Sequence, residues 1–331
     1  MLIGETIRKI RLLIQRDGNS IRNTGRKALR SGQTVFHYSR KSQPRPVLGA
    51  FVERLEKALA VDWKLAKRQR RTAIVLFEQY AKEQFHKDMF STKTLQMHTI
   101  PIGLAVTPET RIEPYNDMKK YVEGLRDDIA VMNCVCREST EKIGGSCRHS
   151  DTRETCLQFG NSARYVIGGG VGRPITNEEA LNILNRAEEA GFVLQPQNSC
   201  EPKFICCCCV DCCHALKMMK MQPKPADFCS AIYYTTIDPS KCKGCKKCID
   251  CCGMEAISLQ DKVAVVNLDR CIDCGACFVA CKNGAHTLHK KEKTYVPPKN
   301  QDAMYQQIMV ERFGIDDTMK MVSKIHTGEK V

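Results

Sequence analysis

The sequence predicts an α+β protein with a basic helical N-terminal region, a mainly helical cysteine-rich domain, a small domain around two cysteine runs, and a helical tail. Three observations predict this class. Apolar residues recur at helical spacing in the N-terminal third and again around residues 177–187. Short apolar runs flank the two cysteine runs and end at turn residues. The 331 residues suffice for two or three domains, and we expect the parts to be 1–95, 96–230, 231–292 and 293–331.

The N-terminal third is strongly basic and has no cysteine. Residues 1–100 hold 21 Lys and Arg against 8 Asp and Glu, a net charge of +13 in a chain whose total is +14. Apolar residues at helical spacing predict a short amphipathic helix over residues 3–14, a second from about residue 50, and a third over residues 73–85. The charge and the lack of thiols indicate a module distinct from the rest of the chain.

Three interpretations of this basic region remain open. In the first, the basic faces are solvated, as most charged helix faces are. The region could instead dock on a membrane surface or on an acidic partner protein. Nucleic-acid binding is the least favoured, because the sequence offers charge without a recognisable helix-turn-helix motif.

The most informative feature is the spacing Cys-x2-Cys-x2-Cys-x3-Cys, which occurs twice. Each run supplies four thiols at ligand spacing, which is the number that a [4Fe–4S] cluster needs. Two runs at this spacing make chance or a zinc site a poor explanation. The runs are Cys242, Cys245, Cys248 and Cys252, and then Cys271, Cys274, Cys277 and Cys281.

Residues 231–290 resemble a bacterial dicluster ferredoxin domain. In such domains the fourth cysteine of each run crosses to the other cluster. The resemblance therefore implies two [4Fe–4S] clusters with crossed ligands. The first cluster would take Cys242, Cys245, Cys248 and Cys281, and the second Cys271, Cys274, Cys277 and Cys252.

The surrounding sequence agrees with this resemblance in most details. Residues 231–237 predict a strand, and two apolar runs joined by Gln260, Asp261 and Lys262 predict a hairpin. The family usually has Pro after the fourth cysteine of a run, whereas this chain has Gly253 and Lys282. Cys251 is an extra thiol beside Cys252, and either of the two could be the ligand.

A second set of cysteines lies upstream. Its first group is Cys134, Cys136, Cys147 and Cys156, four thiols within 23 residues. Four thiolates can close a tetrahedral site, and both zinc and iron–sulfur centres accept such a set. The sequence therefore allows either a zinc clip or part of an iron–sulfur centre at this group.

The second upstream group places six cysteines within residues 206–213. On a helix Cys206, Cys209 and Cys213 would share a face, whereas on a strand Cys206 and Cys208 would do so. Packing alone does not explain six thiols, so we expect a further metal or iron–sulfur centre. The candidate ligands are Cys206, Cys208, Cys209, Cys212 and Cys213, shared with or separate from the first group. Cys200 and Cys229 stand apart from both groups.

Thr176 and Glu179 form a capping box between these groups, and Gly191 is the expected end of the helix that follows. Residues 95–315 as a whole, with HTIPIG, CVCR, ETCLQFG and ICCCCVDCC in this order, resemble a family of bacterial and archaeal 4Fe–4S ferredoxin proteins. Some relatives lack a cysteine at the position of Cys207, which makes Cys207 the weakest ligand candidate. The resemblance implies iron–sulfur binding and redox chemistry, without a specific reaction.

The first functional hypothesis is an iron–sulfur electron-transfer protein that serves a redox partner protein. It would carry two [4Fe–4S] clusters and a third centre or more, with zinc as the alternative at the first upstream group. An oxidoreductase subunit with a catalytic cysteine-rich centre is the second hypothesis, and a redox-responsive regulator that touches DNA is the third. The sequence shows no export signal and many cysteines, so we expect a cytoplasmic protein of an anaerobe.

Overall fold

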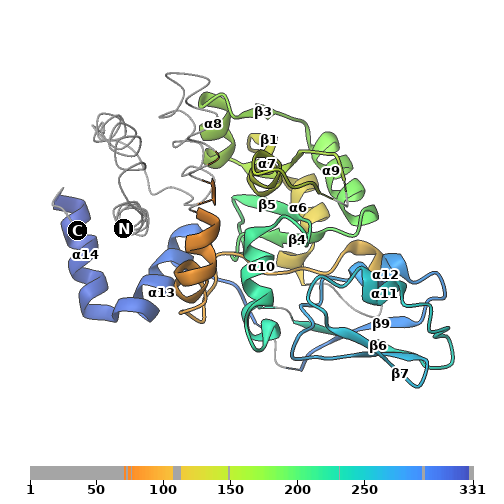
Figure 1. The fold of residues 1–331 in the computed structure, drawn as a ribbon. Helices are drawn as coiled ribbons and strands as arrows, with labels where there is room; N and C mark the ends of the chain where they lie inside the picture. Colours follow the sequence, from red (N-terminus) through yellow and green to blue (C-terminus); the bar gives the residue numbers. More distant parts are fainter. Residues whose placement is uncertain are drawn as a thin grey trace. The chain divides into compact units, whose positions relative to one another are not determined.

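The computed structural model describes residues 71–327 except 72–73, 76, 107–112, 148–149, 231 and 293–294 (Figure 1). Contacts divide the chain into two compact units. One comprises Met1–Phe85, Glu138–Ser146 and Val331, and the other comprises His86–Arg137 and Cys147–Lys330. All 21 cysteines belong to the second unit. The helices expected over residues 3–14 and from residue 50 lie outside the described residues.

In the first unit, the expected helix over residues 73–85 is confirmed where it is described. Residues 77–80 are helical and continue into the π-helix η1 (Ala81–Phe85). The ring of Phe85 packs on those of Phe77 and Tyr80, with centroids 6.1 Å and 5.8 Å away. These apolar side chains at helical spacing give the segment its buried face.

The cysteine-rich part of the second unit contains many helices, and they pack on a five-stranded sheet that the expectation of a mainly helical domain did not include. The strands pair antiparallel in the order β3-β1-β2-β5-β4. Their bounds are β1 Ile129–Asn133, β2 Glu154–Phe159, β3 Gly172–Pro174, β4 Val193–Pro196 and β5 Phe204–Cys208. The strands are short, and cysteines fill the last three positions of β5, so the sequence lacks the apolar–polar alternation that usually reveals a strand.

Helices cover both faces of this sheet. Val131, Leu157 and Ile205 point to the face that packs on α6 (Met118–Gly124) and α9 (Asn177–Glu189). Ala130 and Met132 point to the other face, which packs on α8 (Asn161–Gly168). Because side chains alternate along a strand, each cysteine of β2 and β5 is assigned to one of these two environments.

Helix α9 begins and ends as the sequence predicts. The Thr176 hydroxyl accepts a hydrogen bond from the Glu179 N–H at 3.1 Å, and the helix ends before Gly191, whose φ is +69°. The remaining short elements of this part lie between the strands or after them. They are α5 His86–Met89, η2 Gly103–Ala105, η3 Pro114–Asn116, α7 Val135–Lys142, α10 His214–Lys220 and η4 Pro225–Phe228.

The part around the two cysteine runs has two antiparallel strand pairs and two short helices (Figure 1). The expected hairpin is confirmed, since Gln260 and Val263 close a two-residue turn in which Asp261 and Lys262 both have positive φ. The expected strand at residues 231–237 is observed from Tyr233 onward. The elements are β6 Tyr233–Ile237, α11 Lys247–Asp250, β7 Ile257–Gln260, β8 Val263–Val266, α12 Ala276–Ala280 and β9 His286–Lys290.

The expected helical tail is confirmed as α13 (Gln301–Phe313) and α14 (Ile315–Thr327). Asn300 caps α13, and Met304 and Ile308 of that helix are buried. Glu311 accepts a hydrogen bond from the Thr94 hydroxyl at 2.6 Å, so α13 is tied to the rest of its unit. None of the described helices is long and apolar enough to cross a membrane.

Candidate metal centres

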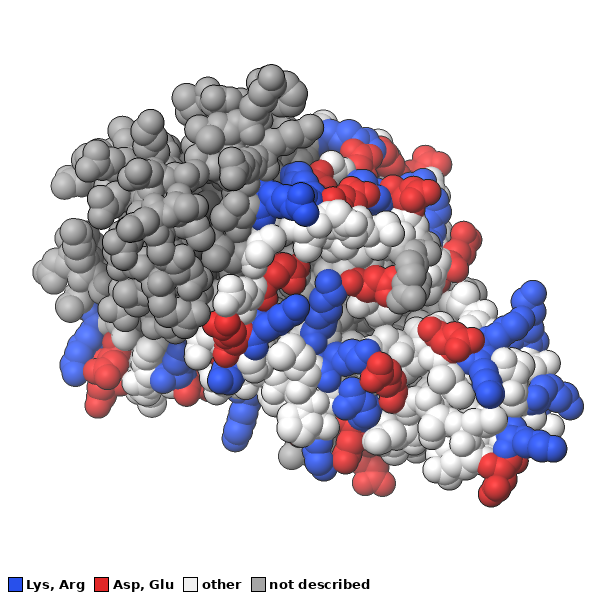
Figure 2. All heavy atoms as spheres, in the orientation of Figure 1, with Lys and Arg blue, Asp and Glu red and all other residues white. Residues whose placement is uncertain are grey.

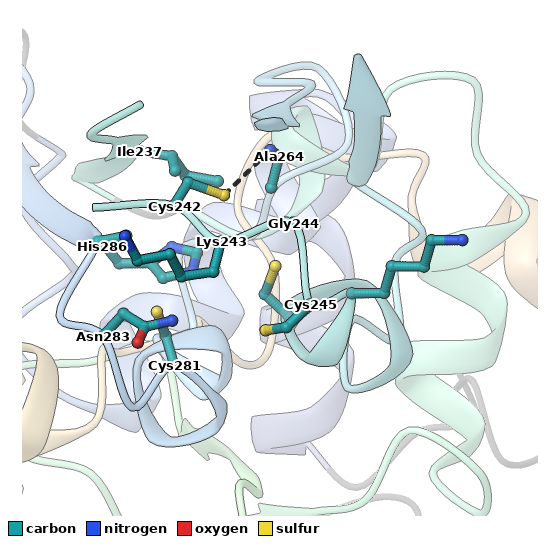
Figure 3. A pocket seen from close by; sticks show the side chains of 12 residues that line it. Ile237, Cys242, Lys243, Gly244, Cys245, Ala264, Cys281, Asn283 and His286 are labelled. Atoms are coloured by element: carbon teal, nitrogen blue, oxygen red, sulfur yellow. Dashed lines mark hydrogen bonds between the residues drawn. The ribbon is translucent and has the colours of Figure 1, made fainter. Parts of the chain in front are cut away.

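The structure brings one set of four ferredoxin-type cysteines around a common cavity. The cavity has an empty volume of about 340 Å³, and Figure 3 shows the labelled Cys242, Cys245 and Cys281 around it. Its four thiols come from the first run and from the last cysteine of the second run, namely Cys242, Cys245, Cys248 and Cys281. This grouping matches the crossed pattern, and ligation by these thiols stays a prediction.

The loop around this first cavity suits thiolates. The backbone N–H of Ala264 donates a hydrogen bond to the Cys242 sulfur at 3.4 Å. Gly244 has a φ of +62°, and a side chain there would place Cβ 2.5 Å from the carbonyl oxygen of Lys262. Glycine thus lets the backbone approach closely, and amide donors stabilise the negative charge of a cluster.

Lysine side chains surround this cavity on the outside. Lys243, Lys246 and Lys247 are exposed, and so is Cys245 between them. Figure 2 shows several Lys and Arg side chains projecting from the end of the molecule that holds β6, β7 and β9. The first cavity therefore opens near a positively charged surface.

A second cavity, with an empty volume of about 520 Å³, is lined by the other four predicted ligands. They are Cys252, Cys271, Cys274 and Cys277. Cys251 also lines it, but the two neighbours differ in their partners. Cys252 accepts a hydrogen bond from the Ala256 N–H at 3.3 Å, whereas the Cys251 thiol donates to the Cys248 carbonyl oxygen at 3.4 Å. These contacts favour Cys252 as the ligand, because its sulfur accepts an amide N–H while the Cys251 thiol is used as a donor.

Burial affects the thiols that line the second cavity. Burial raises the pKa of Cys274 to about 12, and burial together with the neighbouring Asp273 raises that of Cys271. A bare thiolate would be costly here, whereas a metal ion stabilises it. Asp273 lies 3.3 Å from the Cys271 sulfur and forms an ion pair with Lys291 at 3.1 Å.

Two apolar residues from the sheet part also line the second cavity, and sequence reasoning missed both. Val193 begins β4, and Val210 follows Cys209 in the loop after β5. A side chain at Gly253 would place Cβ 2.0 Å from a Val210 methyl carbon. The cysteine-rich loop therefore packs directly on the segment that carries Cys252.

Upstream, six thiols form a linked group that we call the six-thiol cluster. The sheet supplies three of them, because Cys156 and Cys206 are direct cross-strand partners and Cys208 shares the face of Cys206. The segment after β1 and helix α7 supply Cys134 and Cys136, and Cys213 lies at the N-terminus of α10. The members are Cys134, Cys136, Cys156, Cys206, Cys208 and Cys213.

Hydrogen bonds connect these thiols in a chain. The Cys134 thiol is hydrogen-bonded to the Cys136 thiol. Cys136 is in turn hydrogen-bonded to Cys213, and Cys213 to Cys208. Cys208 is hydrogen-bonded to Cys206, and Cys206 is hydrogen-bonded to Cys156. Bonds from Cys136 and Cys208 lower the pKa of Cys213 to about 5, and bonds from Cys156 and Cys208 lower that of Cys206. Thiols this close in a buried place are suited to sharing metal ions.

Three of the four remaining thiols of the two upstream groups form a separate set, which we call the three-thiol site. The sulfurs of Cys147, Cys209 and Cys212 all lie within 4.8 Å of one another, and those of Cys147 and Cys209 are 3.5 Å apart. The zinc clip expected from Cys134, Cys136, Cys147 and Cys156 is therefore not the grouping in the structure. The sheet holds Cys156 with Cys206, whereas Cys147 meets the loop after β5.

Arg137 lies between these two groups and is fully buried. Its guanidinium donates to Thr152 O at 3.0 Å, Thr155 Oγ1 at 2.6 Å and Cys207 O at 2.9 Å, and it lies over the Phe192 ring. It also bonds the Cys209 sulfur, and the nearby thiols raise its pKa. Sequence reasoning missed this residue, although it directly follows Cys136 in the CVCR motif.

Several other candidates lie outside these groups. Cys207 points to the opposite face of β5 and is part of the apolar core, in line with its rank as the weakest ligand candidate. Cys200 and Cys229 donate to the backbone oxygens of Pro297 and Ala226. Among the histidines near cysteines, His286 lines the first cavity, where burial lowers its pKa.

Two cavities with four cysteines each, joined by crossed runs and edged by two small strand pairs, define a two-cluster iron–sulfur domain. A family model described as a 4Fe–4S dicluster domain matches residues 234–282. A ferredoxin of Methanothermococcus thermolithotrophicus is 43% identical over 56 residues, which are 16% of this chain and 93% of that protein. The chain belongs to the ferredoxin family, as a 4Fe–4S protein with a C-terminal dicluster domain.

A second relative gives a narrower match. An uncharacterized ferredoxin of Methanocaldococcus jannaschii is 41% identical over 49 residues, which are 14% of this chain and 32% of that protein. No solved structure matches the chain. An iron–sulfur electron-transfer role is supported by the dicluster domain.

Proposed function

We propose that this protein carries electrons between a redox partner protein and a buried cysteine-rich centre. Two [4Fe–4S] clusters would occupy the first and second cavities, and a third iron–sulfur centre would occupy the six-thiol cluster. Each cluster supplies a site that accepts one electron and gives it up again. The protein supplies the thiolates, the amide donors and the spacing between the centres.

One observation favours this relay above the others. The loop that carries Cys209 and Cys213 also places Val210 in the wall of the second cavity, against Gly253. Ile102, from the HTIPIG segment, donates its N–H to the carbonyl oxygen of Cys274 at 3.2 Å. These contacts between the two parts support an order of first cavity, second cavity and six-thiol cluster.

The surface charge supports an acidic partner at the first cavity. Exposed Lys243, Lys246 and Lys247 flank the exposed Cys245, so a negatively charged protein would be drawn to this end. The partner would reduce or oxidise the first cluster, and the electron would move on to the second. Membrane docking through residues 1–95, and a cytoplasmic location, remain proposals that rest on the sequence.

Metal analysis and an EPR redox titration of the anaerobically purified protein test this function. We expect at least about eight iron and eight sulfide in two ferredoxin-type centres, with additional iron for the third. Cys208→Ser should remove the third signal alone, whereas Cys207→Ser, the matched control on the opposite face of β5, should leave all signals. An iron content near four, or loss of a ferredoxin signal in Cys208→Ser, would contradict the proposal.

The six-thiol cluster also favours a second candidate, an oxidoreductase subunit. Six thiols exceed the four that a saturated cube requires, and surplus thiols permit thiol–disulfide chemistry. If the centre is a carrier, added thiols or disulfides should leave every EPR signal unchanged. A change confined to the third signal, and removed by Cys208→Ser, would instead identify a catalytic centre.

A further inference from the structure

The three-thiol site differs from the iron–sulfur sites in the spacing of its sulfurs. Each cysteine of a [4Fe–4S] cluster binds a different iron, so the thiols must stand around a whole cube. Three thiolates on one tetrahedral ion lie closer, about 3.8 Å apart for metal–sulfur bonds of about 2.3 Å. Cys147, Cys209 and Cys212 are within 4.8 Å of one another, with one pair at 3.5 Å. Among the described residues, this is the one group of three or more potential ligands at that spacing.

We propose that Cys147, Cys209 and Cys212 bind one zinc ion, separate from the iron–sulfur centres. The proposal rests on the proposed function in assigning the six-thiol cluster to the third iron–sulfur centre. Binding releases three thiol protons and leaves the fourth position of the ion to another ligand.

The charge of Arg137 supports a divalent ion. A zinc ion with three thiolates has a net charge of −1, which the buried guanidinium of Arg137 would neutralise. The guanidinium contacts the Cys209 sulfur. Among the described residues, its hydrogen-bond partners are carbonyls, a hydroxyl and a thiol rather than a carboxylate. A fully buried cation needs a negative partner, and a thiolate-bound ion provides one.

An orphaned donor points in the same direction. The Nε–H of Arg137 is buried and has no hydrogen-bond partner in the structure. Buried donors almost always have an acceptor. A neighbouring site that gains negative charge on metal binding would provide the missing interaction for this N–H. Cys209 and Cys212 are buried and Cys147 is partly buried, which gives the ion a largely dry environment.

Local structure already holds the three thiols in place. Cys209 and Cys212 are three residues apart in the loop after β5, the spacing of a zinc knuckle. The Cys213 N–H donates to the Cys209 carbonyl oxygen at 3.1 Å, which closes this loop into a turn. The third thiol comes from a distant segment, so the ion would join Cys147 to the loop that also contacts the second cavity.

The test is elemental analysis and zinc X-ray absorption on the full chain, purified anaerobically with its clusters. We expect one zinc per chain, with sulfur neighbours at about 2.3 Å. Cys147→Ser and Cys212→Ser should each lower zinc content at least tenfold while iron and sulfide stay constant. Cys207→Ser, a buried thiol of the same stretch, should keep the zinc.

Other results would overturn the proposal. Loss of iron and sulfide in Cys147→Ser, without zinc in the wild type, would assign the three thiols to the iron–sulfur centre. A disulfide between Cys147 and Cys209 in the anaerobic protein would exclude the ion as well. The spectrum of the wild type decides the matter even if both variants fail to fold. Failure of the relay would show instead as missing ferredoxin signals, which these measurements report separately.

Discussion

Val210 occupies the space above Gly253 that any side chain at that position would need. The added Cβ would lie 2.0 Å and 2.3 Å from two Val210 carbons. Related ferredoxins usually have Pro after the fourth cysteine, and here the neighbouring cysteine-rich loop takes that room. The departure from the family pattern is thus explained by contact with a part of the chain outside the dicluster domain.

We predict that Gly253→Ala destabilises the protein by about 1–3 kcal/mol, since overpacking forces neighbouring groups to shift. The change should also broaden the EPR signals of the second cluster and of the third centre, because the clash lies between them. Chemical denaturation and EPR measure the two effects. The double variant Gly253→Ala with Val210→Gly should recover most of the loss, and failure to recover would show that the contact is not the cause.

The crossed arrangement of the cysteines predicts which cluster each single cysteine substitution damages. Cys281→Ala should damage the same cluster as Cys248→Ala, and Cys252→Ala should damage the other. The reason is that the last cysteine of each run lines the cavity of the other run. EPR of each variant after anaerobic reduction shows which signal is lost. Cys251→Ala is the control and should keep both signals. If Cys248→Ala and Cys252→Ala removed one common signal, the crossed assignment would be wrong.

Asp273 should lower the reduction potential of the second cluster. Its carboxyl is buried beside the Cys271 sulfur, and a negative charge there disfavours the more negative reduced state. Asp273→Asn should raise that potential by an amount on the order of 50 mV, because Lys291 already offsets part of the charge. An EPR-monitored titration measures the shift. The potential of the first cluster should not move, and an equal shift in both clusters would point to a general structural change.

His98 should make stability depend on acidity. Burial lowers its pKa to about 4 from an ordinary value of 6.5, while Asn116 holds its ring at 3.2 Å. Between these two values the unfolded chain binds a proton that the folded chain does not. Stability is therefore complete above pH 6.5 and falls as the pH drops toward 4, by about 3 kcal/mol.

Denaturation at several pH values, compared with His98→Gln, measures this contribution. The variant should lose the part of the pH dependence between 4 and 6.5 while keeping the remainder. An identical pH profile in both proteins would mean that His98 does not titrate as its burial requires.

Residues 1–95 should govern partner choice and not cluster assembly. A chain of residues 96–331 should retain its iron, because all cysteines lie beyond residue 95. It should lose salt-sensitive binding to anionic vesicles or duplex DNA, whichever the full chain shows, and keep binding of an acidic protein at the first cavity. Iron analysis and binding at two salt concentrations test both statements. Loss of iron on truncation would refute the division into two modules.

Local patterns predicted the dicluster part well, because its determinants are close in sequence. The spacing of the runs and the hairpin turn at Asp261 and Lys262 each act within a few residues, as does the capping box at Thr176 in the sheet part. The sheet around the upstream cysteines could not be predicted in this way. The pairing of Cys156 with Cys206 joins residues 50 apart, and no local pattern reports such a contact.

The same limit applies to the upstream site. The sequence suggested Cys134, Cys136, Cys147 and Cys156 as one group because they are near each other in the chain. The structure separates Cys147 from the rest, since strand pairing and the loop after β5 decide which thiols meet. The role of Arg137 depends on its burial between thiols of different segments, which a single sequence does not show.

Because side chains alternate along β5, the six-thiol cluster can bind a metal centre only when β5 has the correct register with its neighbouring strands. β5 is bonded to a strand on each side, so its register with β2 and β4 decides which sulfurs face which way. A slip of one residue would turn Cys207 outward and send Cys206 and Cys208 into the apolar core. A chain with this misalignment would lack two thiols of the six-thiol cluster. Metal binding would therefore stabilise only the sheet with the correct register.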